Sequence, residues 1–240
     1  MDIKLPLVSF LAFLLLFSSC DEGFSEVEVE DSQAHLMNLS DSCSYQLDGK
    51  LVIHDKKVGF IGRGNAQVNL DSTTDKGHPD SVLFWTGFKV ESETNESLTL
   101  RFVKKYGKNQ LTKSEIFIAR PEEELKLYTQ GRHSFAVDFE RFNTQNGVTI
   151  DIVNKSDKFR YLKSYLPESR RWLTTIGYDC QNNSNFEITN LHKLPNGKYL
   201  LEAKFDANVF YYEEKIAPDN NVIVEGKQKR IEKGYIRLHL

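Results

Sequence analysis

Short runs of β-branched and aromatic residues recur along the chain from Tyr45 onward, and turn sequences separate them. Leu98, Leu100 and Phe102 occupy alternate positions and therefore face the same side of a strand. Many short strands with frequent turns favour an antiparallel β-sandwich or a partly open barrel, so we predict an all-β fold. We expect strands in the runs 45–47, 51–53, 58–61, 67–70, 82–90, 98–103, 115–119, 134–139, 148–153, 173–178, 186–191, 199–205, 209–212, 222–224 and 235–240.

The turn sequences support this interpretation. Asp48-Gly49 stands between two apolar runs, and this dipeptide adopts the left-handed conformation that a tight hairpin requires. Asn146-Gly147 and Pro195-Asn196-Gly197 are further turn signals.

One segment has helical rather than strand periodicity. Between residues 157 and 166, apolar side chains recur at helical spacing, with Ser156 or Asp157 as a cap and Pro167 as a stop. We therefore expect at most one short helix, in this segment.

The N-terminal segment has the layout of a secretory signal peptide. Lys4 precedes an apolar run from Leu5 to Phe17, and two serines then lead to Cys20. The run is much shorter than the roughly 20 apolar residues that a membrane-spanning helix needs. A cysteine directly after small residues resembles the lipobox of bacterial lipoproteins. The resemblance implies that residues 1–19 are a signal peptide and that Cys20 carries the lipid that attaches the chain to a membrane.

The segment after Cys20 is acidic. Residues 21–31 contain acids and no base, and no Lys or Arg follows until Lys50. Such a segment repels itself and buries little apolar surface, so we expect residues 20–43 to form a flexible acidic tether. The β-sandwich domain would then occupy residues 44–240. The acidic composition also resembles the export signal of Bacteroidetes surface lipoproteins, which implies an outer-membrane location, with the cell-surface face favoured over the periplasmic face.

Composition limits the partners. The formal net charge is −3, so the chain lacks the basic excess that binds nucleic acid, and we expect no nucleic-acid partner. Aromatic residues make up 12% of the chain, which indicates a packed core. We found no motif for a cofactor or a metal and expect neither. The six histidines have no metal-ligand spacing, and the acids of the loop 71–81 match no calcium-loop pattern.

Two cysteines remain if Cys20 is lipidated. Cys43 and Cys180 are then an even pair in an oxidising compartment, which favours a disulfide. A bridge would contribute about 4–5 kcal/mol by the loop-entropy model. The alternative is two buried free thiols, because cysteine also packs well as a small apolar residue.

The segment from residue 155 to residue 172 is rich in basic and aromatic residues, although the net charge of the whole chain is negative. Guanidinium groups pair with carboxylates, and aromatic faces stack on sugar rings, so the segment is a candidate site for an acidic glycan. The alternative is an amphipathic segment whose aromatic side chains pack inward. The candidate ligand-binding residues are Lys158, Arg160, Tyr161, Tyr165, Arg171 and Trp172.

Strand and turn motifs near both ends of the chain resemble those of uncharacterised β-sandwich lipoproteins of Bacteroidetes. The likeness leaves residues 55–180 largely unmatched. It implies an envelope location and a β-sandwich, and it supplies no catalytic residues. The matching residues are Cys20, Asp48-Gly49-Lys50, Phe186-Glu187-Ile188-Thr189, Gly197-Lys198-Tyr199-Leu200, Lys204-Phe205 and Gly234-Tyr235-Ile236-Arg237-Leu238.

Two functions follow from these observations. The first is a non-catalytic, lipid-anchored binding or adhesion module whose partner is a glycan or a protein of the envelope or the cell exterior. The second is an envelope hydrolase whose catalytic carboxylates come together only in the fold. We assign no catalytic residue from the sequence.

Overall fold

The structure is a computed structural model that describes residues 35–55, 57–67, 81–93, 96–107, 110–112, 120–121, 124–137, 146–154, 161–166, 175–216 and 222–240. The chain divides into two compact units, Met1–Asn38 and Leu39–Leu240. The second unit contains all the strands among the described residues and is described below. Cys20 and the predicted signal peptide lie outside the described residues, as does most of the predicted tether.

The described elements are almost entirely β-strands. The first group is β1 (Ser42–Leu47), β2 (Lys50–His54), β3 (Lys57–Gln67), β4 (Ser81–Glu91), β5 (Ser97–Gly107), β6 (Leu111–Thr112) and β7 (Arg120–Pro121). The second group is the 3-10 helix η2 (Glu124–Tyr128) and the strands β8 (Gly131–His133), β9 (Gly147–Val153), β10 (Tyr161–Lys163), β11 (Asn185–Lys193), β12 (Tyr199–Ile216) and β13 (Val222–His239).

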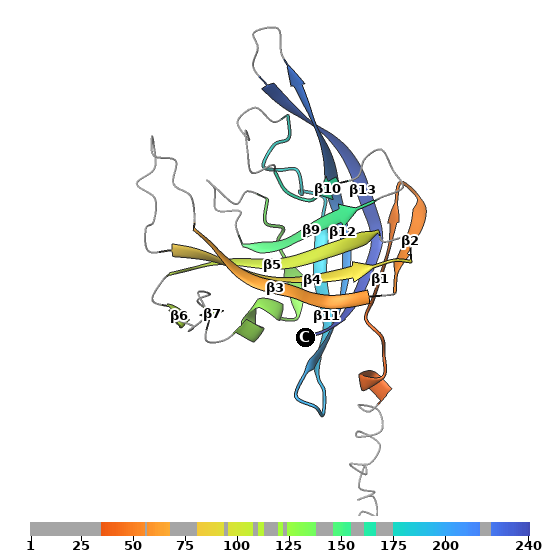
Figure 1. The fold of residues 1–240 in the computed structure, drawn as a ribbon, viewed down its shortest axis with the longest axis vertical. Helices are drawn as coiled ribbons and strands as arrows, with labels where there is room; N and C mark the ends of the chain where they lie inside the picture. Colours follow the sequence, from red (N-terminus) through yellow and green to blue (C-terminus); the bar gives the residue numbers. More distant parts are fainter. Residues whose placement is uncertain are drawn as a thin grey trace, which may run out of the picture. The chain divides into compact units, whose positions relative to one another are not determined.

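Eleven of these strands form one antiparallel sheet that curls into a half-barrel. Its main path runs β2-β1-β13-β12-β10-β9-β5-β4-β3, and β11 and β8 extend from β12 as a branch. In Figure 1, β3, β4, β5 and β9 cross in front of the long strands β12 and β13. The prediction of an all-β antiparallel fold is confirmed. A single curled sheet corresponds to the partly open barrel named in that prediction.

The two edges of the sheet meet at one corner. β2 and β3 are the edge strands of the path, yet β2 ends at His54 and β3 begins at Lys57. The curl therefore brings the two edges close together where the chain passes from one to the other. His54 is fully buried at this corner, and its Nε2 lies 3.1 Å from the hydroxyl of Tyr45.

The core lies on the inner face of the curl. Phe102 of β5 and Phe186 of β11 are fully buried, and their ring centroids are 5.9 Å apart although their strands are not hydrogen-bonded neighbours. Phe186 also stacks on Phe205 of β12 at 6.0 Å. The two halves of the sheet thus pack against each other, and each buried aromatic side chain contributes about 2–3 kcal/mol.

The helix η2 covers one end of this core. Tyr128 is buried, and its ring lies 4.9 Å from that of Phe102. Its hydroxyl lies 2.6 Å from Oγ1 of the buried Thr86, so each polar atom has a partner.

Local sequence signals located the hairpins well. Asp48 and Gly49 have φ of 51° and 77°, the left-handed pair predicted for the β1–β2 turn. Two predicted pairs of short strands are instead single long strands, because β12 and β13 continue through a bulge between Phe205 and Ala207. Asp206 resembles a turn residue, but its Oδ1 accepts a hydrogen bond from the backbone N of Lys233 at 2.9 Å and stabilises the bulge.

Three local predictions were wrong. The helix expected at 157–166 is the strand β10 at Tyr161–Lys163, because its apolar Leu162 packs into the core of a sheet. Residues 134–137 form one isolated bridge, Phe135 to Val148, rather than a strand. Residues 175–178 are irregular instead of extended. Residues 138–139, 157–160 and 173–174 of these segments lie outside the described residues, as do 68–70 and 115–119.

Candidate functional site

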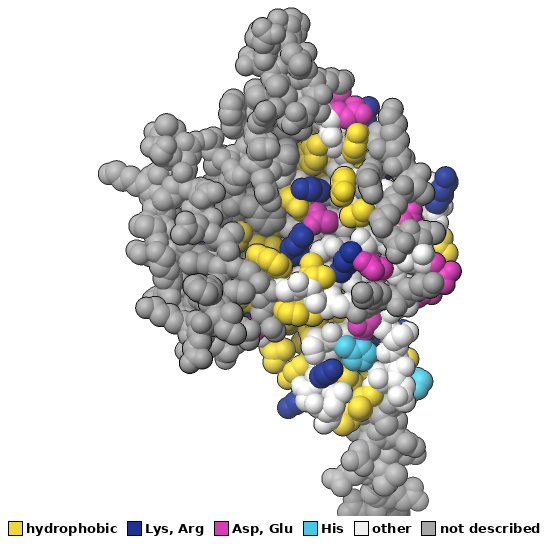
Figure 2. Space-filling model, viewed as in Figure 1, with side chains coloured by type: hydrophobic (Ala, Val, Ile, Leu, Met, Phe, Trp, Pro, Cys, Tyr) yellow, Lys and Arg dark blue, Asp and Glu magenta, His cyan; other side chains and the backbone are white. Residues whose placement is uncertain are grey.

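Charged and aromatic side chains cross the outer face of β4, β5, β9 and β10. Thr99 pairs with Asp151, and Asp151 pairs with Lys163, so side chains far apart in sequence form one row. Figure 2 shows basic and acidic side chains alternating over β5, β9 and β10, with hydrophobic side chains on both sides. We call this surface the charged strip and define it as Trp85, Arg101, Asp151, Tyr161 and Lys163.

An ion pair lies at the centre of the charged strip. The guanidinium of Arg101 contacts Oδ2 of Asp151, and its Cζ lies 5.8 Å from the ring centroid of Trp85. The other carboxylate oxygen, Oδ1 of Asp151, is buried and has no hydrogen-bond partner among the described residues. A buried acceptor without a donor is destabilising, so this carboxylate depends on its ion pair with Arg101.

A glycine keeps the strip flat. A Cβ on Gly87 would lie 2.9 Å from Cγ1 of Ile61 and 3.4 Å from Cγ of Arg101. The missing side chain lets Ile61 and Arg101 approach each other over β4.

A groove of about 380 Å³ opens on the strip. Tyr161 is 56% exposed at its rim, and Lys163 and Asp151 also line it. Tyr165 is buried in the wall, with Nζ of Lys163 5.2 Å from its ring centroid. The volume is within the range of small-ligand sites, roughly 300–1,000 Å³, and the walls combine aromatic rings with charges.

The structure describes two of the six predicted ligand-binding residues. Tyr161 and Tyr165 both line the groove, but Tyr161 is exposed while Tyr165 is buried. Because β10 is a strand, its side chains alternate in direction. Tyr161 and Lys163 face outward, and Leu162 faces the core. The other predicted residues, Lys158, Arg160, Arg171 and Trp172, lie outside the described residues.

Sequence reasoning missed Trp85, Arg101 and Asp151. Each stands among apolar residues at an outward position of a strand, as any surface residue of a sheet does. Their proximity depends on the pairing of β4, β5 and β9, which the sequence alone does not specify.

The two cysteines of the predicted bridge are both free thiols. Cys43 is in register with Ile236, and Ile236 with Ala203 of β12, whereas the carbonyl of Cys180 accepts a hydrogen bond from Nδ2 of Asn208. Ala203 and Asn208 are five residues apart, which is roughly 16 Å along β12 at about 3.3 Å per residue. A disulfide requires Cα atoms within about 7 Å, so the predicted bridge finds no support in this structure. Burial raises the pKa of both thiols, that of Cys180 to about 11.

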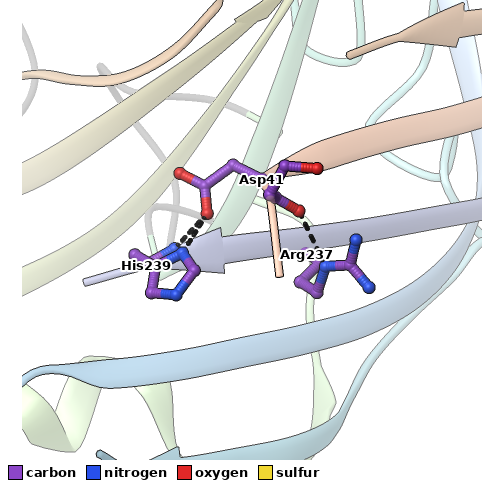
Figure 3. Close-up of polar contacts among 4 residues, drawn as sticks. Asp41, Arg237 and His239 are labelled. Atoms are coloured by element: carbon purple, nitrogen blue, oxygen red, sulfur yellow. Dashed lines mark hydrogen bonds and ion pairs between the residues drawn. The ribbon is translucent and has the colours of Figure 1, made fainter. Parts of the chain in front are cut away.

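A histidine–aspartate pair joins the two ends of the domain (Figure 3). Oδ1 of Asp41 lies 2.5 Å from Nδ1 of His239 and accepts a hydrogen bond from its backbone N at 2.8 Å. Nearby, Nε of Arg237 donates to the carbonyl of Ser40 at 2.9 Å. A catalytic triad needs a nucleophile on the second ring nitrogen, but Nε2 of His239 is buried without a partner among the described residues. What the structure shows is that Ser40 and Asp41 are tied to the end of β13, and we call the Asp41–His239 pair the clamp.

A second acidic side chain is also held by the fold. Glu202 accepts hydrogen bonds from Tyr235 and, at 2.8 Å, from Nδ2 of Asn190. The hydrogen bond from Tyr235 lowers the pKa of Glu202, and burial raises that of Tyr235 to about 12. Both oxygens of this carboxylate are occupied, so it has little capacity for a ligand.

Among the described residues, no three His, Cys, Asp or Glu side chains gather at metal-binding distance. Within the same residues, no helix is long and apolar enough to cross a bilayer. Comparison with protein-family models, with curated proteins and with solved structures found no match to the chain.

Proposed function

We propose that this protein is a lipid-anchored binding module of the bacterial cell envelope, and that the charged strip holds an acidic glycan. In this proposal Cys20 carries the lipid, and the acidic tether presents the domain at the outer membrane, on the cell surface. The protein acts without catalysis.

The groove on the charged strip carries this proposal. Arg101 and Lys163 flank the groove and can pair with the carboxylates of an acidic sugar. The exposed ring of Tyr161 offers a face for stacking on a sugar.

The same groove favours binding over hydrolysis. Glycoside hydrolysis commonly uses two carboxyl groups about 5–10 Å apart across the scissile bond. Among the described residues that line the groove, Asp151 is the single acid, and its Oδ2 is engaged by Arg101. A carboxylate held in an ion pair is suited to positioning a ligand.

Binding is tested with the detergent-solubilised full chain on an array of acidic and neutral glycans. We expect acidic glycans to bind, and Lys163→Ala and Tyr161→Ala each to weaken binding roughly tenfold, because each removes one charged or stacking contact. Lys198→Ala is the matched control, since it removes an exposed cation from the β11–β12 turn. An array without acidic ligands would reject the proposal. Arg171→Ala and Trp172→Ala test the remaining predicted residues in the same assay.

The anchor is tested separately. We expect Cys20→Ala to move the protein from the detergent-extracted membrane fraction to the soluble fraction, or to leave an uncleaved precursor. Wild-type processing and fractionation of this variant would show that Cys20 is not the anchor.

A further inference from the structure

The strand β2 is a free edge of the sheet. Among the described residues, β1 is its hydrogen-bonded neighbour on one side, and no strand pairs with its other side. Figure 1 shows β2 at the outer margin of the sheet, beside β1. A free edge presents backbone N–H and C=O groups to which the strand of another chain can add.

Two large apolar side chains project from this edge strand. Leu51 is 65% exposed and Ile53 is 52% exposed. In the register with β1, Leu51 lies opposite Gln46 and Ile53 lies opposite Ser44, so both stand beside polar side chains on the outer face of the sheet. Val52, between them, packs against the core. We call Leu51 and Ile53 the apolar edge.

The hairpin determines which backbone groups of β2 point away from β1. Asp48-Gly49 has positive φ at both residues, and a turn of this type closes with hydrogen bonds between the flanking Leu47 and Lys50. Hydrogen-bonded and non-hydrogen-bonded pairs alternate along an antiparallel ladder, so Leu51 and Ile53 are at non-hydrogen-bonded positions opposite β1. Their N–H and C=O groups therefore point to the free side of β2. The residues of the apolar edge are thus the ones that can bond a further strand.

The other edge strand, β3, is less suited to adding a strand. Its register with β4 shifts between Phe60 and Gly62, whereas the register of β2 with β1 is unbroken. Ile61, the extra residue at this bulge, lies against Gly87 of β4. A bulge interrupts the row of backbone groups and twists the edge, which hinders pairing with another strand.

We propose that β2 is a contact between two copies of this chain, which pair antiparallel about a two-fold axis at Val52. In this register Leu51 of one copy lies opposite Ile53 of the other. The outward N–H and C=O groups of both residues then obtain partners, and the exposed side chains of the apolar edge pack across the contact. Lys50 and Asp55 stand at opposite ends of β2, so antiparallel pairing brings each Lys50 near Asp55 of the second copy.

The two edges also differ in the assembly that they would form. A head-to-tail contact of β2 with β3 of the next copy would continue from molecule to molecule, and the bulge in β3 disfavours it. A contact of β2 with β2 uses the same strand in both copies, so it is complete with two. Because β2 has 5 residues, the contact is short, and we expect a weak dimer with a Kd on the order of 10–100 μM. This inference does not depend on the glycan site of the charged strip.

The test is sedimentation velocity of the detergent-solubilised full chain over a range from about 1 to about 300 μM, at a fixed ratio of detergent to protein. We expect the mass to rise from that of one chain to that of two within this range. A mass of one chain throughout, or growth beyond two chains, would overturn the proposal.

Variants assign the dimer to β2. Leu51→Pro removes an N–H that faces the second copy and keeps the hydrogen bonds to β1, and Ile53→Lys places a charge in the apolar contact. Each should weaken dimerisation at least tenfold, while the circular dichroism of the domain stays unchanged. Leu125→Lys is the matched control, because Leu125 of η2 is also apolar and 45% exposed, and it should leave dimerisation unchanged. A dimer that persists in both β2 variants would contradict the assignment.

A cross-link tests the position of the axis. In the proposed register Val52 lies opposite Val52 of the second copy at a non-hydrogen-bonded position, where Cα atoms are about 4.5 Å apart and a disulfide can form. We therefore expect Val52→Cys to give a disulfide-linked dimer on non-reducing gels after mild oxidation, and Leu125→Cys to give none. Absence of the Val52→Cys cross-link would show that the two-fold axis is not at this residue and would overturn the proposed register.

Discussion

Two arginines on the outer face of the sheet are used in different ways. Arg230 of β13 donates hydrogen bonds to Oδ1 of Asn208 at 2.9 Å, to Oγ of Ser184 at 3.2 Å and to the carbonyl of Asn183 at 2.6 Å. Arg101 of β5 contacts Asp151 and lies over Trp85 beside an open groove. The first arginine joins a loop to the sheet, whereas the second is placed where a ligand can reach it.

The surroundings of Arg230 show why it is structural. Gln181 donates hydrogen bonds at 2.7 Å to the carbonyls of Ser164 and Asn208, and its Oε1 accepts the backbone N–H of Asn208. The loop also passes close to the sheet at Gly226, where a Cβ would lie 1.9 Å from Ile176. Acceptors that belong to the protein occupy the donors of Arg230, so removing this side chain costs stability.

The largest expected effect is on the network around Arg230. Asn208→Ala removes the hydrogen bonds to the carbonyl of Cys180 and from Arg230; the carbonyl loses this donor, and Arg230 keeps only its bonds to Ser184 and Asn183. Because each buried unpaired group costs about 1–3 kcal/mol, we expect the free energy of unfolding to fall by about 2–4 kcal/mol in urea titrations. Asn190→Ala is the control; it removes one side-chain hydrogen bond, to Glu202, and should cost about 1 kcal/mol. Equal losses would contradict a network role for Asn208.

A smaller effect tests the geometry of the arginine itself. Arg230→Lys keeps the charge but loses the fork that reaches three acceptors, so we expect a loss of about 1–2 kcal/mol. Hydrogen exchange should quicken at residues 180–184 before it does so in β12. Arg237→Lys is the comparison and should change less, because Nε of Arg237 donates one hydrogen bond, to the carbonyl of Ser40 at 2.9 Å, and does not bridge a loop to the sheet. Unchanged exchange in Arg230→Lys would show that the loop does not need the fork.

The buried His54 makes the free energy of unfolding depend on pH. Burial lowers the pKa of His54 below its ordinary value of about 6.5, so the unfolded chain takes up a proton first as the pH falls. The contribution of neutral His54 to the free energy of unfolding is therefore fully present above about pH 6.5. It is lost as the pH falls below that value, by at most about 1.4 kcal/mol per pH unit. Urea titrations from about pH 7.5 to about pH 5 should show a flatter profile for His54→Gln. Parallel profiles would mean that other groups cause the acid sensitivity.

Arg101→Ala should have the smallest effect on stability. The side chains of the Arg101–Asp151 pair are 31% and 16% exposed, so solvent screens much of their attraction, and we expect a loss of about 1 kcal/mol or less. Binding of acidic glycans should fall at least tenfold in the same variant. Lys89→Ala is the matched control, since Lys89 pairs with Glu91 at 2.5 Å and does not line the groove. A large loss of stability in Arg101→Ala would assign Arg101 the same structural role as Arg230.

These differences indicate what the sequence could predict. Leu98, Leu100 and Phe102 alternate as expected and are all buried, because side-chain direction along a strand depends on neighbours in sequence. Val103 is outward-facing yet 3% exposed, since Ala136 packs beside it. Ala136 is distant from Val103 in sequence, so no pattern of neighbouring residues predicts this contact.

The candidate site was predicted in part for the same reason. Tyr161 and Tyr165 stood in a visibly basic and aromatic segment, so composition identified them. Arg101 and Asp151 are fifty residues apart and meet because β5 pairs with β9 in one register. The choice of register follows from packing of the whole sheet, and a shift by one residue would turn Arg101 inward.

The clamp between Asp41 and His239 has a mechanical consequence. β1 begins just after Asp41 and is hydrogen-bonded on both sides, to β2 and to β13. A pull on the chain before Asp41, directed along β1, first loads the contacts of Asp41 and Ser40 with β13. It then loads both ladders of β1 in shear, because their hydrogen bonds lie perpendicular to the strand and share the force instead of opening one by one. The point where the N-terminal segment joins the domain is thus built to bear tension.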